Sequence, residues 1–293
     1  MKNWKMISVS GVAATTVVLA LTGAAIAAPS GTARLAAVGL TADQKLVTFT
    51  LQGRGDRAAV AAVRGLVGDH RLIGIDRRVQ DGLLYGVGNA GGVYTLRSAD
   101  GRATKVSQLT VALSGAAFGV DFNPAADRLR VISDTGQNLR HNVNAGGTTI
   151  ADTTMTYPPA TTAAGGVTGV AYTNNDLDAD TGTTLYDIDT TLDQVVLQSP
   201  ANSGQLSPVG KLGVDAAGDA GFDIYASVRK GTATDAVGFA VLTVGSRTGI
   251  YRISLVTGRA HHIGTAPKAR QLTDLAVGLD RNSPGPVRPG RAS

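Results

Sequence analysis

The stretch GVDFNPAADRLRVISDTGQNLR, residues 119–140, contains the pattern that decides the fold. A short apolar segment, GVDF, leads into an Asn-Pro turn, and the alternating run RLRVIS follows. Asp-Thr-Gly then marks a second turn before the next apolar segment begins. Asn, Pro, Asp and Gly are typical of turns, which separate one strand from the next. Alternating apolar side chains are typical of half-buried strands. The stretch therefore predicts three short strands joined by tight turns.

Related segments recur along the chain. They share a G-x-D or G-x-A start, and their starts lie 45, 50 and 52 residues apart. Each start is followed by a polar turn and by further strand-like runs. Four short strands per unit of this length is the size of a β-propeller blade. The starts are Gly74-Ile75-Asp76, Gly119-Val120-Asp121, Gly169-Val170-Ala171 and Gly221-Phe222-Asp223.

The two ends of the chain complete the count of blades. Residues 35–52 read as middle strands without a first strand, and residues 271–280 read as a first strand without the rest. Together they make one more blade, which removes the open sheet edges. We therefore predict an all-β, five-bladed β-propeller closed by pairing of the C-terminal strand with N-terminal strands. A β-sandwich or an irregular β-solenoid is the alternative.

Within the unit that starts at Gly169, two runs are assigned to strands. TLYDID, residues 184–189, is predicted as the third strand, and VVLQS, residues 195–199, as the fourth. Elsewhere in the chain, residues 56–66 are helix-like because alanines recur at helical spacing, although an outer strand or a loop fits equally well.

The first residues resemble a targeting signal. Lys2 and Lys5 precede the apolar run 7–22, and Ala25-Ile26-Ala27 provides a small-x-small cleavage pattern. The run is short for a membrane span, so a cleaved signal is favoured over an uncleaved anchor. We expect a secreted, extracellular protein with a signal peptide at 1–27, one propeller domain at 28–280 and a disordered tail at 281–293.

Composition narrows the class of function. All 22 acidic residues are Asp, and there is no Cys, so thiol chemistry and disulfides are excluded. Removing Lys2 and Lys5 with the signal lowers the formal charge from +5 to +3. This mild excess of basic residues is spread along the chain and does not form the basic stripe typical of nucleic-acid binding. The expected partner is a small ligand or a cell-envelope component, with no nucleic acid and no membrane span in the mature chain. We expect a monomer.

Four segments carry a resemblance to a known family. They are GVDFNPAADRLRVISDTGQNLRHNV, GVTGVAYTNND…TTLYDIDTTLDQVVLQSPANSGQLSPVGKLGVD, GFDIY and GIYRISLVTGRAHHIG. Together they resemble a bacterial exported family known as domain-of-unknown-function family 4394, and the match covers roughly residues 34–280. The resemblance implies a propeller-like exported domain without an established activity. It supplies no catalytic residues.

Three repeat carboxylates form the first candidate site. Asp76, Asp121 and Asp223 occupy the third position of the predicted innermost strands. Innermost strands line the channel of a propeller, so these side chains could ring one end of it and bind a cation or a polar ligand. A structural role is the alternative, in which each Asp accepts backbone N–H bonds or pairs with a nearby Arg such as Arg77 or Arg130.

An acidic loop forms the second candidate site. Asp176, Asp178 and Asp180 alternate along the loop Asn174–Gly182, and alternate carboxylates on a turn can converge on Ca²⁺. The spacing departs from an EF-hand, because Gly stands one position late and the flanking segments read as strands. A solvated hairpin loop is therefore the favoured interpretation, with calcium binding as the alternative.

The four histidines lack ligand spacing, and we interpret all of them as surface or edge residues. They are His70, His141, His261 and His262. The favoured function is a secreted binding or scaffold module, with Ca²⁺ as a possible cofactor. The alternative is an Asp-dependent extracellular glycoside hydrolase, which would work without a Glu acid and without a Trp platform in the mature chain.

Overall fold

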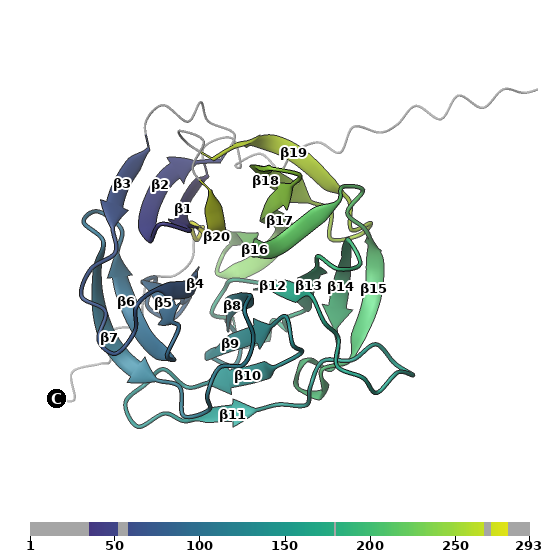
Figure 1. The fold of residues 1–293 in the computed structure, drawn as a ribbon, viewed down its shortest axis with the longest axis horizontal. Coiled ribbons are helices and arrows are strands. Elements are labelled where there is room, and N and C mark those ends of the chain that lie inside the picture. Colours follow the sequence, from purple (N-terminus) through teal and green to yellow (C-terminus); the bar gives the residue numbers. More distant parts are fainter. Residues whose placement is uncertain (1–34, 52–57, 179, 267–270, 281–293) are drawn as a thin grey trace, which may run out of the picture.

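The computed structural model describes residues 35–51, 58–178, 180–266 and 271–280. These residues form five antiparallel sheets of four strands each, arranged in a ring (Figure 1). Within the described residues, the helical structure is the 3₁₀ turn η3, Ala201–Ser203. The predicted five-bladed propeller is confirmed. The predicted signal peptide and tail lie outside the described residues.

We number the sheets as blades 1 to 5. In each blade, we call the strand that lies nearest the propeller axis the inner strand. Blade 1 contains β20 (Leu272–Val277), β1 (Ala36–Thr41), β2 (Lys45–Thr50) and β3 (Ala59–Ala62), from the centre outward. Blade 2 contains β4 (Leu72–Arg77), β5 (Leu84–Gly88), β6 (Gly92–Arg97) and β7 (Arg102–Gln108). Blade 3 contains β8 (Phe118–Asn123), β9 (Arg128–Ser133), β10 (Asn138–His141) and β11 (Thr149–Ala151).

The other two blades continue the same order. Blade 4 contains β12 (Val167–Tyr172), β13 (Leu185–Asp189), β14 (Gln194–Gln198) and β15 (Leu206–Lys211). Blade 5 contains β16 (Ala216–Arg229), β17 (Thr232–Val244), β18 (Arg247–Ile253) and β19 (Ala260–Thr265). The helix-like stretch at 56–66 therefore includes an outer strand, β3.

The ring closes in blade 1, where β20 pairs antiparallel with β1. The register places Ala37 opposite Val277, and the amide of Gly278 donates to the carbonyl of Ala36 at 2.7 Å. The predicted pairing of C-terminal and N-terminal strands is confirmed. The inner strand of this blade, β20, comes from the C-terminal part of the chain. By pairing with β1 it covers an edge of the sheet that an open propeller would expose.

Blade 4 differs from the prediction by one strand. The run at 185–189 is the second strand of the blade and the run at 194–198 is the third, whereas the fourth is Leu206–Lys211. The long polar loop between β12 and β13 explains the error, because it is long enough to suggest an additional strand.

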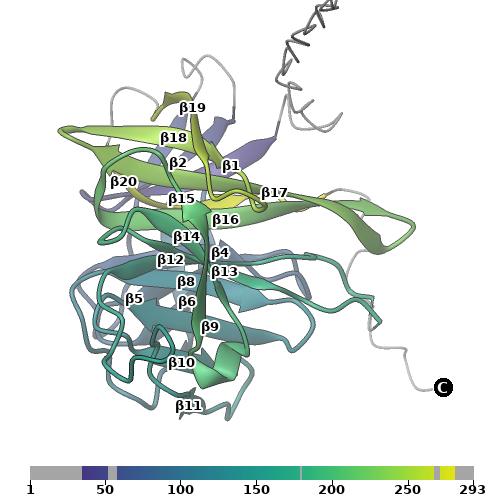
Figure 2. The same cartoon turned by 90° about the vertical axis from the view of Figure 1, so that its right-hand side faces the viewer.

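Blade 5 carries a long hairpin made by β16 and β17, with 14 and 13 residues. Figure 2 shows its end projecting beyond the other strands of the propeller. The loop between β12 and β13 supports that end through hydrogen bonds to Thr232 and Ala233.

The apolar core is divided among the interfaces between blades. Five clusters of buried side chains are present, and each joins two neighbouring blades. Tyr85 and Phe122 illustrate the packing, with ring centroids 5.1 Å apart across the interface of blades 2 and 3. Among the described residues, no helix is long and apolar enough to span a membrane.

Candidate functional site: an axial ring of carboxylates

The inner strands approach one another closely around the propeller axis. The glycines that begin the repeats make this approach possible. A Cβ at Gly74 would lie 2.5 Å from a methyl group of Val120, and one at Gly119 would lie 2.8 Å from the carbonyl oxygen of Thr168. The G-x-D pattern therefore combines a contact point between strands with a carboxylate two residues later.

The structure brings the three repeat carboxylates together. Each of Asp76, Asp121 and Asp223 offers an oxygen, and these oxygens all lie within 4.8 Å of one another. The residues are 5%, 3% and 3% exposed, respectively. Three carboxylates from three different blades thus converge at one place on the axis.

Each carboxylate also connects its blade to the inner strand of another blade. The Phe122 amide donates to Asp76 Oδ2 at 2.8 Å, the Tyr172 amide to Asp121 Oδ1 at 3.1 Å, and the Val277 amide to Asp223 Oδ2 at 2.5 Å. The sequence left open whether these carboxylates accept backbone N–H bonds or pair with Arg. Backbone N–H donors are the observed partners.

A fourth inner-strand carboxylate, Asp274, was not predicted. Its Oδ2 accepts the amide of Ile75 at 2.7 Å. The β20 segment reads Asp-Leu-Ala, so its Asp stands where the other repeats have Gly, and its Ala276 stands where three of them have Asp. Aligning 274–276 with the G-x-D starts would have revealed it.

Blade 4 completes this set of contacts without a carboxylate. Its inner strand has Ala171 at the Asp position, and Thr168 Oγ1 accepts the amide of Ala220 at 3.1 Å instead. Each of the five inner strands therefore has a side chain that accepts an N–H from the next one. We call Asp76, Asp121, Asp223 and Asp274 the axial ring.

Electrostatic repulsion and burial act on the axial ring together. Burial raises the pKa of Asp76 well above its ordinary value, and the charge of Asp223 adds to the shift. Burial likewise raises the pKa of Asp121, with the charge of Asp76 as the next cause. The pKa of Asp274 is also raised well above its ordinary value by burial, and that of Asp223 is raised by burial to about 6.

No described Lys, Arg or His forms an ion pair with the axial ring. Arg77 is near enough for its charge to act on Asp223. Its buried Nε has no hydrogen-bond partner, and burial lowers the pKa of its guanidinium. The ring therefore concentrates carboxyl groups that form no ion pair with a described cation.

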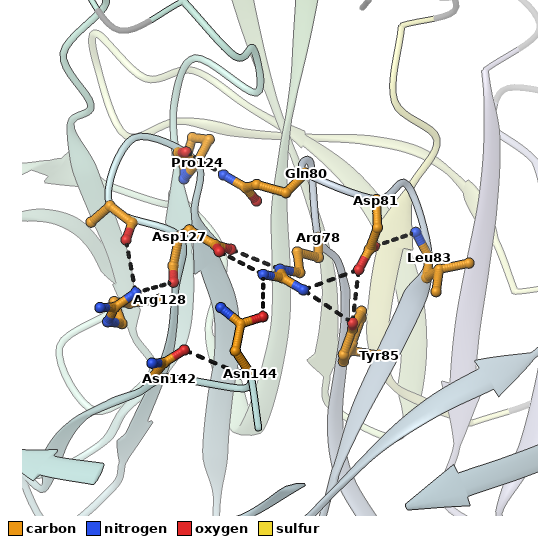
Figure 3. A network of polar contacts seen from close by, with 11 residues as sticks. Arg78, Gln80, Asp81, Leu83, Tyr85, Pro124, Asp127, Arg128, Asn142 and Asn144 are labelled. Atoms are coloured by element: carbon orange, nitrogen blue, oxygen red, sulfur yellow. Dashed lines mark hydrogen bonds and ion pairs between the residues drawn. The ribbon is translucent and has the colours of Figure 1, made fainter. Parts of the chain in front are cut away.

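Other interfaces hold their carboxylates differently. Arg78 of blade 2 donates from Nε and Nη2 to the two oxygens of Asp127 in blade 3, at 2.7 and 2.5 Å, and from Nη2 to Asn144 at 2.9 Å (Figure 3). It also reaches Asp81 and Tyr85 within its own blade. This two-bond fork joins the blades with the charges matched.

Arg130 occupies the interface of blades 3 and 4 and is only 2% exposed. Its guanidinium donates to Asn138 at 2.6 Å, to Asp152 at 2.8 Å, to Asn202 at 2.9 Å and to the Tyr172 hydroxyl at 3.1 Å. Four acceptors around one buried cation make this a structural centre.

Asp187, on β13, is a buried carboxylate of a third kind. It is fully buried, and neither of its oxygens has a hydrogen-bond partner. Burial raises its pKa well above the ordinary value, and the charge of Arg130 opposes this shift. In the sequence it lies eleven residues after Asp176, where an EF-type loop would have its last ligand.

The acidic loop is tied to the blade 5 hairpin. Asp176 accepts the amides of Asp178 and Ala233 at 2.9 and 2.7 Å, and Asp178 accepts the amide of Asp180 at 3.1 Å and the Thr232 hydroxyl at 2.6 Å. Asp180 is exposed. The described contacts are thus with protein donors, and calcium binding by this loop stays a prediction.

The interpretation of the histidines is wrong for one of the four. His141 is fully buried, because β7 of blade 2 and β11 of its own blade cover it. Both ring nitrogens contact hydroxyl groups, Ser107 at 2.8 Å and Thr149 at 3.0 Å. These contacts join segments that are distant in sequence, so spacing alone could not reveal them.

The fold and the ring define a five-bladed β-propeller with carboxylates on its axis. The family model described as Domain of unknown function (DUF4394) matches residues 45–276. The match covers most of the chain, so the chain belongs to this family, as the sequence resemblance indicated. A search of curated proteins finds no match.

Several solved structures are similar to this chain at low sequence identity. A chain of a nidogen/laminin complex is 11% identical, with 84% of this chain and 98% of that chain covered and a TM-score of 0.47. An auxiliary nutrient binding protein from Bacteroides thetaiotaomicron is 14% identical, with coverages of 82% and 58% and a TM-score of 0.38. A protein of the same description from Bacteroides ovatus is 13% identical, with coverages of 80% and 57% and a TM-score of 0.39. This chain spans little more than half of those two chains, and the likeness concerns the fold alone.

Proposed function

We propose that this protein is a secreted binding module whose axial ring binds a divalent cation, with Ca²⁺ as the preferred ion. The observation that carries the proposal is the convergence of Asp76, Asp121 and Asp223, whose oxygens lie within 4.8 Å of one another. Ca²⁺ takes oxygen ligands, with carboxylates and water completing a shell of about six to eight.

The electrostatics of the axial ring support a cation as the ligand. Burial raises the pKa of Asp121, and the charges of Asp76 and Asp223 raise it further. A bound divalent cation opposes this repulsion, because it stabilises the ionised form of every carboxylate near it. The ligand favoured at this place is therefore positively charged.

Glycoside hydrolysis receives less support from the same geometry. That chemistry needs two carboxyl groups about 5 to 9.5 Å apart on either side of a bound sugar. Asp76, Asp121 and Asp223 lie closer together, are buried, and accept backbone amides of neighbouring strands. Cation binding uses such a cluster as it stands.

The test is thermal unfolding at pH 7 with EDTA and then with about 10 mM CaCl₂, a concentration above the range of about 10⁻⁴–10⁻³ M typical of extracellular sites. We expect calcium to raise the Tm by about 5 °C, the shift that such an affinity gives a domain of this size. Asp121→Asn should abolish the shift, because it removes one ligand charge and keeps an acceptor for the Tyr172 amide.

Asp69→Asn is the matched control. Asp69 is buried and accepts the Ala90 amide at 2.5 Å, but it lies away from the axis, so its variant should keep the full calcium shift. A wild-type Tm that ignores calcium contradicts the proposal. An equal shift in Asp121→Asn contradicts the axial site, and loss of the shift in Asp178→Ala alone would assign calcium to the acidic loop.

A further inference from the structure

His141 lies at the end of β10, where the outer parts of blades 2 and 3 meet. Its Nε2 is 2.8 Å from the Ser107 hydroxyl of β7, and its Nδ1 is 3.0 Å from the Thr149 hydroxyl of β11. A serine, an imidazole within hydrogen-bond reach and a third group that orients the imidazole form the arrangement that activates serine nucleophiles.

The surroundings keep His141 suited to act as a base. Burial lowers the pKa of its imidazole, and the charge of Arg128 acts in the same direction, whereas the backbone carbonyl of Thr148 opposes the shift. The ring is therefore neutral at pH 7. A neutral imidazole has one N–H donor and one nitrogen lone pair.

The contacts on the far side of the ring determine which nitrogen carries the proton. Thr149 Oγ1 accepts the amide of Thr110 at 2.8 Å and has a second lone pair available for a ring N–H at Nδ1. The Thr148 carbonyl is a further acceptor for a ring N–H. With the proton on Nδ1, the lone pair of Nε2 faces the Ser107 hydroxyl.

The local strand geometry leaves Ser107 accessible from the rim. Ser107 is half-buried on β7, the outermost strand of blade 2. A register shift between Val93 and Tyr94 makes Val106 an additional residue in β7, a β-bulge. Bulges re-aim the neighbouring side chain, and an outer strand presents backbone N–H groups that have no partner in its sheet.

Two exposed apolar side chains flank these residues in sequence. Val106, next to Ser107, is 41% exposed, and Ile150, next to Thr149, is 50% exposed. Neighbouring residues of a strand point to opposite faces, so Ile150 faces away from Thr149. The bulge at Val106 alters this alternation next to Ser107, and the exposed apolar side chain of Val106 favours a substrate with an apolar group.

We propose that Ser107 is a nucleophile activated by His141 and that it accepts acyl groups from carboxylic esters with a short apolar acyl chain. Ser107 Oγ attacks the ester carbonyl carbon while its proton passes to His141 Nε2. The carbon–oxygen bond of the ester breaks, and the departing alcohol takes the proton from Nε2. Water then attacks the acyl-serine with the same base, which releases the carboxylic acid and restores Ser107.

The test uses a fluorophosphonate probe on the intact protein. Ser107 Oγ forms a bond to phosphorus, fluoride leaves, and the proton passes to His141, so a single adduct should appear on the peptide that contains Ser107. Mass spectrometry locates it. We expect the labelling rate to fall about 10-fold per pH unit once His141 is protonated, and p-nitrophenyl butyrate to be hydrolysed with the same pH profile.

Variants separate activation from packing. Ser107→Ala should abolish the adduct, and His141→Gln should lower the labelling rate by about 10²-fold or more, because Gln can hydrogen-bond the serine but cannot take its proton. Ser254→Ala is the matched control, since Ser254 is also half-buried and contacts only a hydroxyl and an amide. Its labelling should equal that of the wild type.

Three results would overturn the proposal. They are the absence of an adduct on Ser107, a labelling rate independent of pH between 5 and 8, and an unchanged rate in a folded His141→Gln protein. The pH profile of the wild type decides the matter even where a variant fails to fold. Because the site lies away from the axis, calcium has no part in the outcome.

Discussion

Carboxylates at the contacts between blades are held in two contrasting ways. At the interfaces of blades 2 and 3 and of blades 3 and 4, Arg78 and Arg130 place a guanidinium among the acceptors, and the charges match. On the axis, Asp76, Asp121 and Asp223 accept backbone amides, and no described cation pairs with them. Both arrangements hold strands together, but only the axial one leaves carboxyl groups without an ion pair to a described cation.

The difference indicates where stability and function are located. A buried pair is costly to break because the remaining partner stays desolvated, so the arginine centres should be sensitive to substitution. The axial ring instead lowers the stability of the ionised protein, which a bound cation would restore. Three experiments test this contrast, and we describe them in order of decreasing effect.

Arg130→Met should have the largest effect. The substitution keeps much of the side-chain volume but leaves Asn138, Asn202 and the Tyr172 hydroxyl without their buried donor. We expect unfolding in urea to show a loss of about 3 kcal/mol or more. Arg229→Met, on the exposed end of the blade 5 hairpin, should change stability by less than about 0.5 kcal/mol. Equal losses of stability in the two variants would contradict the structural role of Arg130.

Arg78→Met should have an intermediate effect, because the side chain of Arg78 is 11% exposed and water can reach the groups it leaves. We expect a loss of about 2 kcal/mol in the same assay, typical of hydrogen bonds to charged groups. Arg78→Lys should recover only part of it, since Lys keeps the charge but lacks the planar fork that meets both oxygens of Asp127. Full recovery with Lys would show that charge alone matters there.

The pH dependence contributed by Asp223 should be the smallest effect. Burial raises the pKa of Asp223 from 3.8 to about 6 in the folded protein. The folded state therefore holds this proton more tightly, and the resulting stability is fully present at low pH and is lost as pH rises through about 6. From pH 7 to pH 5, this one group should raise the free energy of unfolding by about 1 kcal/mol.

The measurement compares wild type with Asp223→Asn by urea unfolding in EDTA, so that cations play no part. The variant should lack this component of the pH slope. Groups that titrate in the opposite direction, such as Asp100, whose pKa the Arg97 hydrogen bond lowers, are common to both proteins and cancel. A variant with an unchanged slope would mean that the axial ring does not hold the proton.

The fold and part of the axial ring could be predicted from the sequence because of the repeated G-x-D starts. Those starts located the inner strands and brought Asp76, Asp121 and Asp223 to a common place. Asp274 was missed because its segment has the Asp and the small residue in exchanged positions. In blade 4, the long loop after β12 shifted the assignment of strands by one.

The remaining features depend on contacts between blades, which a repeat pattern does not encode. His141 and Ser107 are 34 residues apart and meet because blades 2 and 3 pack together. Arg130 and Asn202, 72 residues apart, meet for the same kind of reason. Periodicity predicts which side of a strand is buried, whereas the partner across an interface depends on the angle between two blades.

The closing pair of strands has a mechanical consequence. Because β1 runs antiparallel to β20, the described end at Leu35 and the one at Asp280 leave blade 1 from the same edge. Tension applied to those ends would load the hydrogen bonds between the strands one after another, beginning with Gly278 and Ala36, instead of all at once. A modest pull would then unzip the closing pair of strands, and stretching from the two ends should open blade 1 before any other blade.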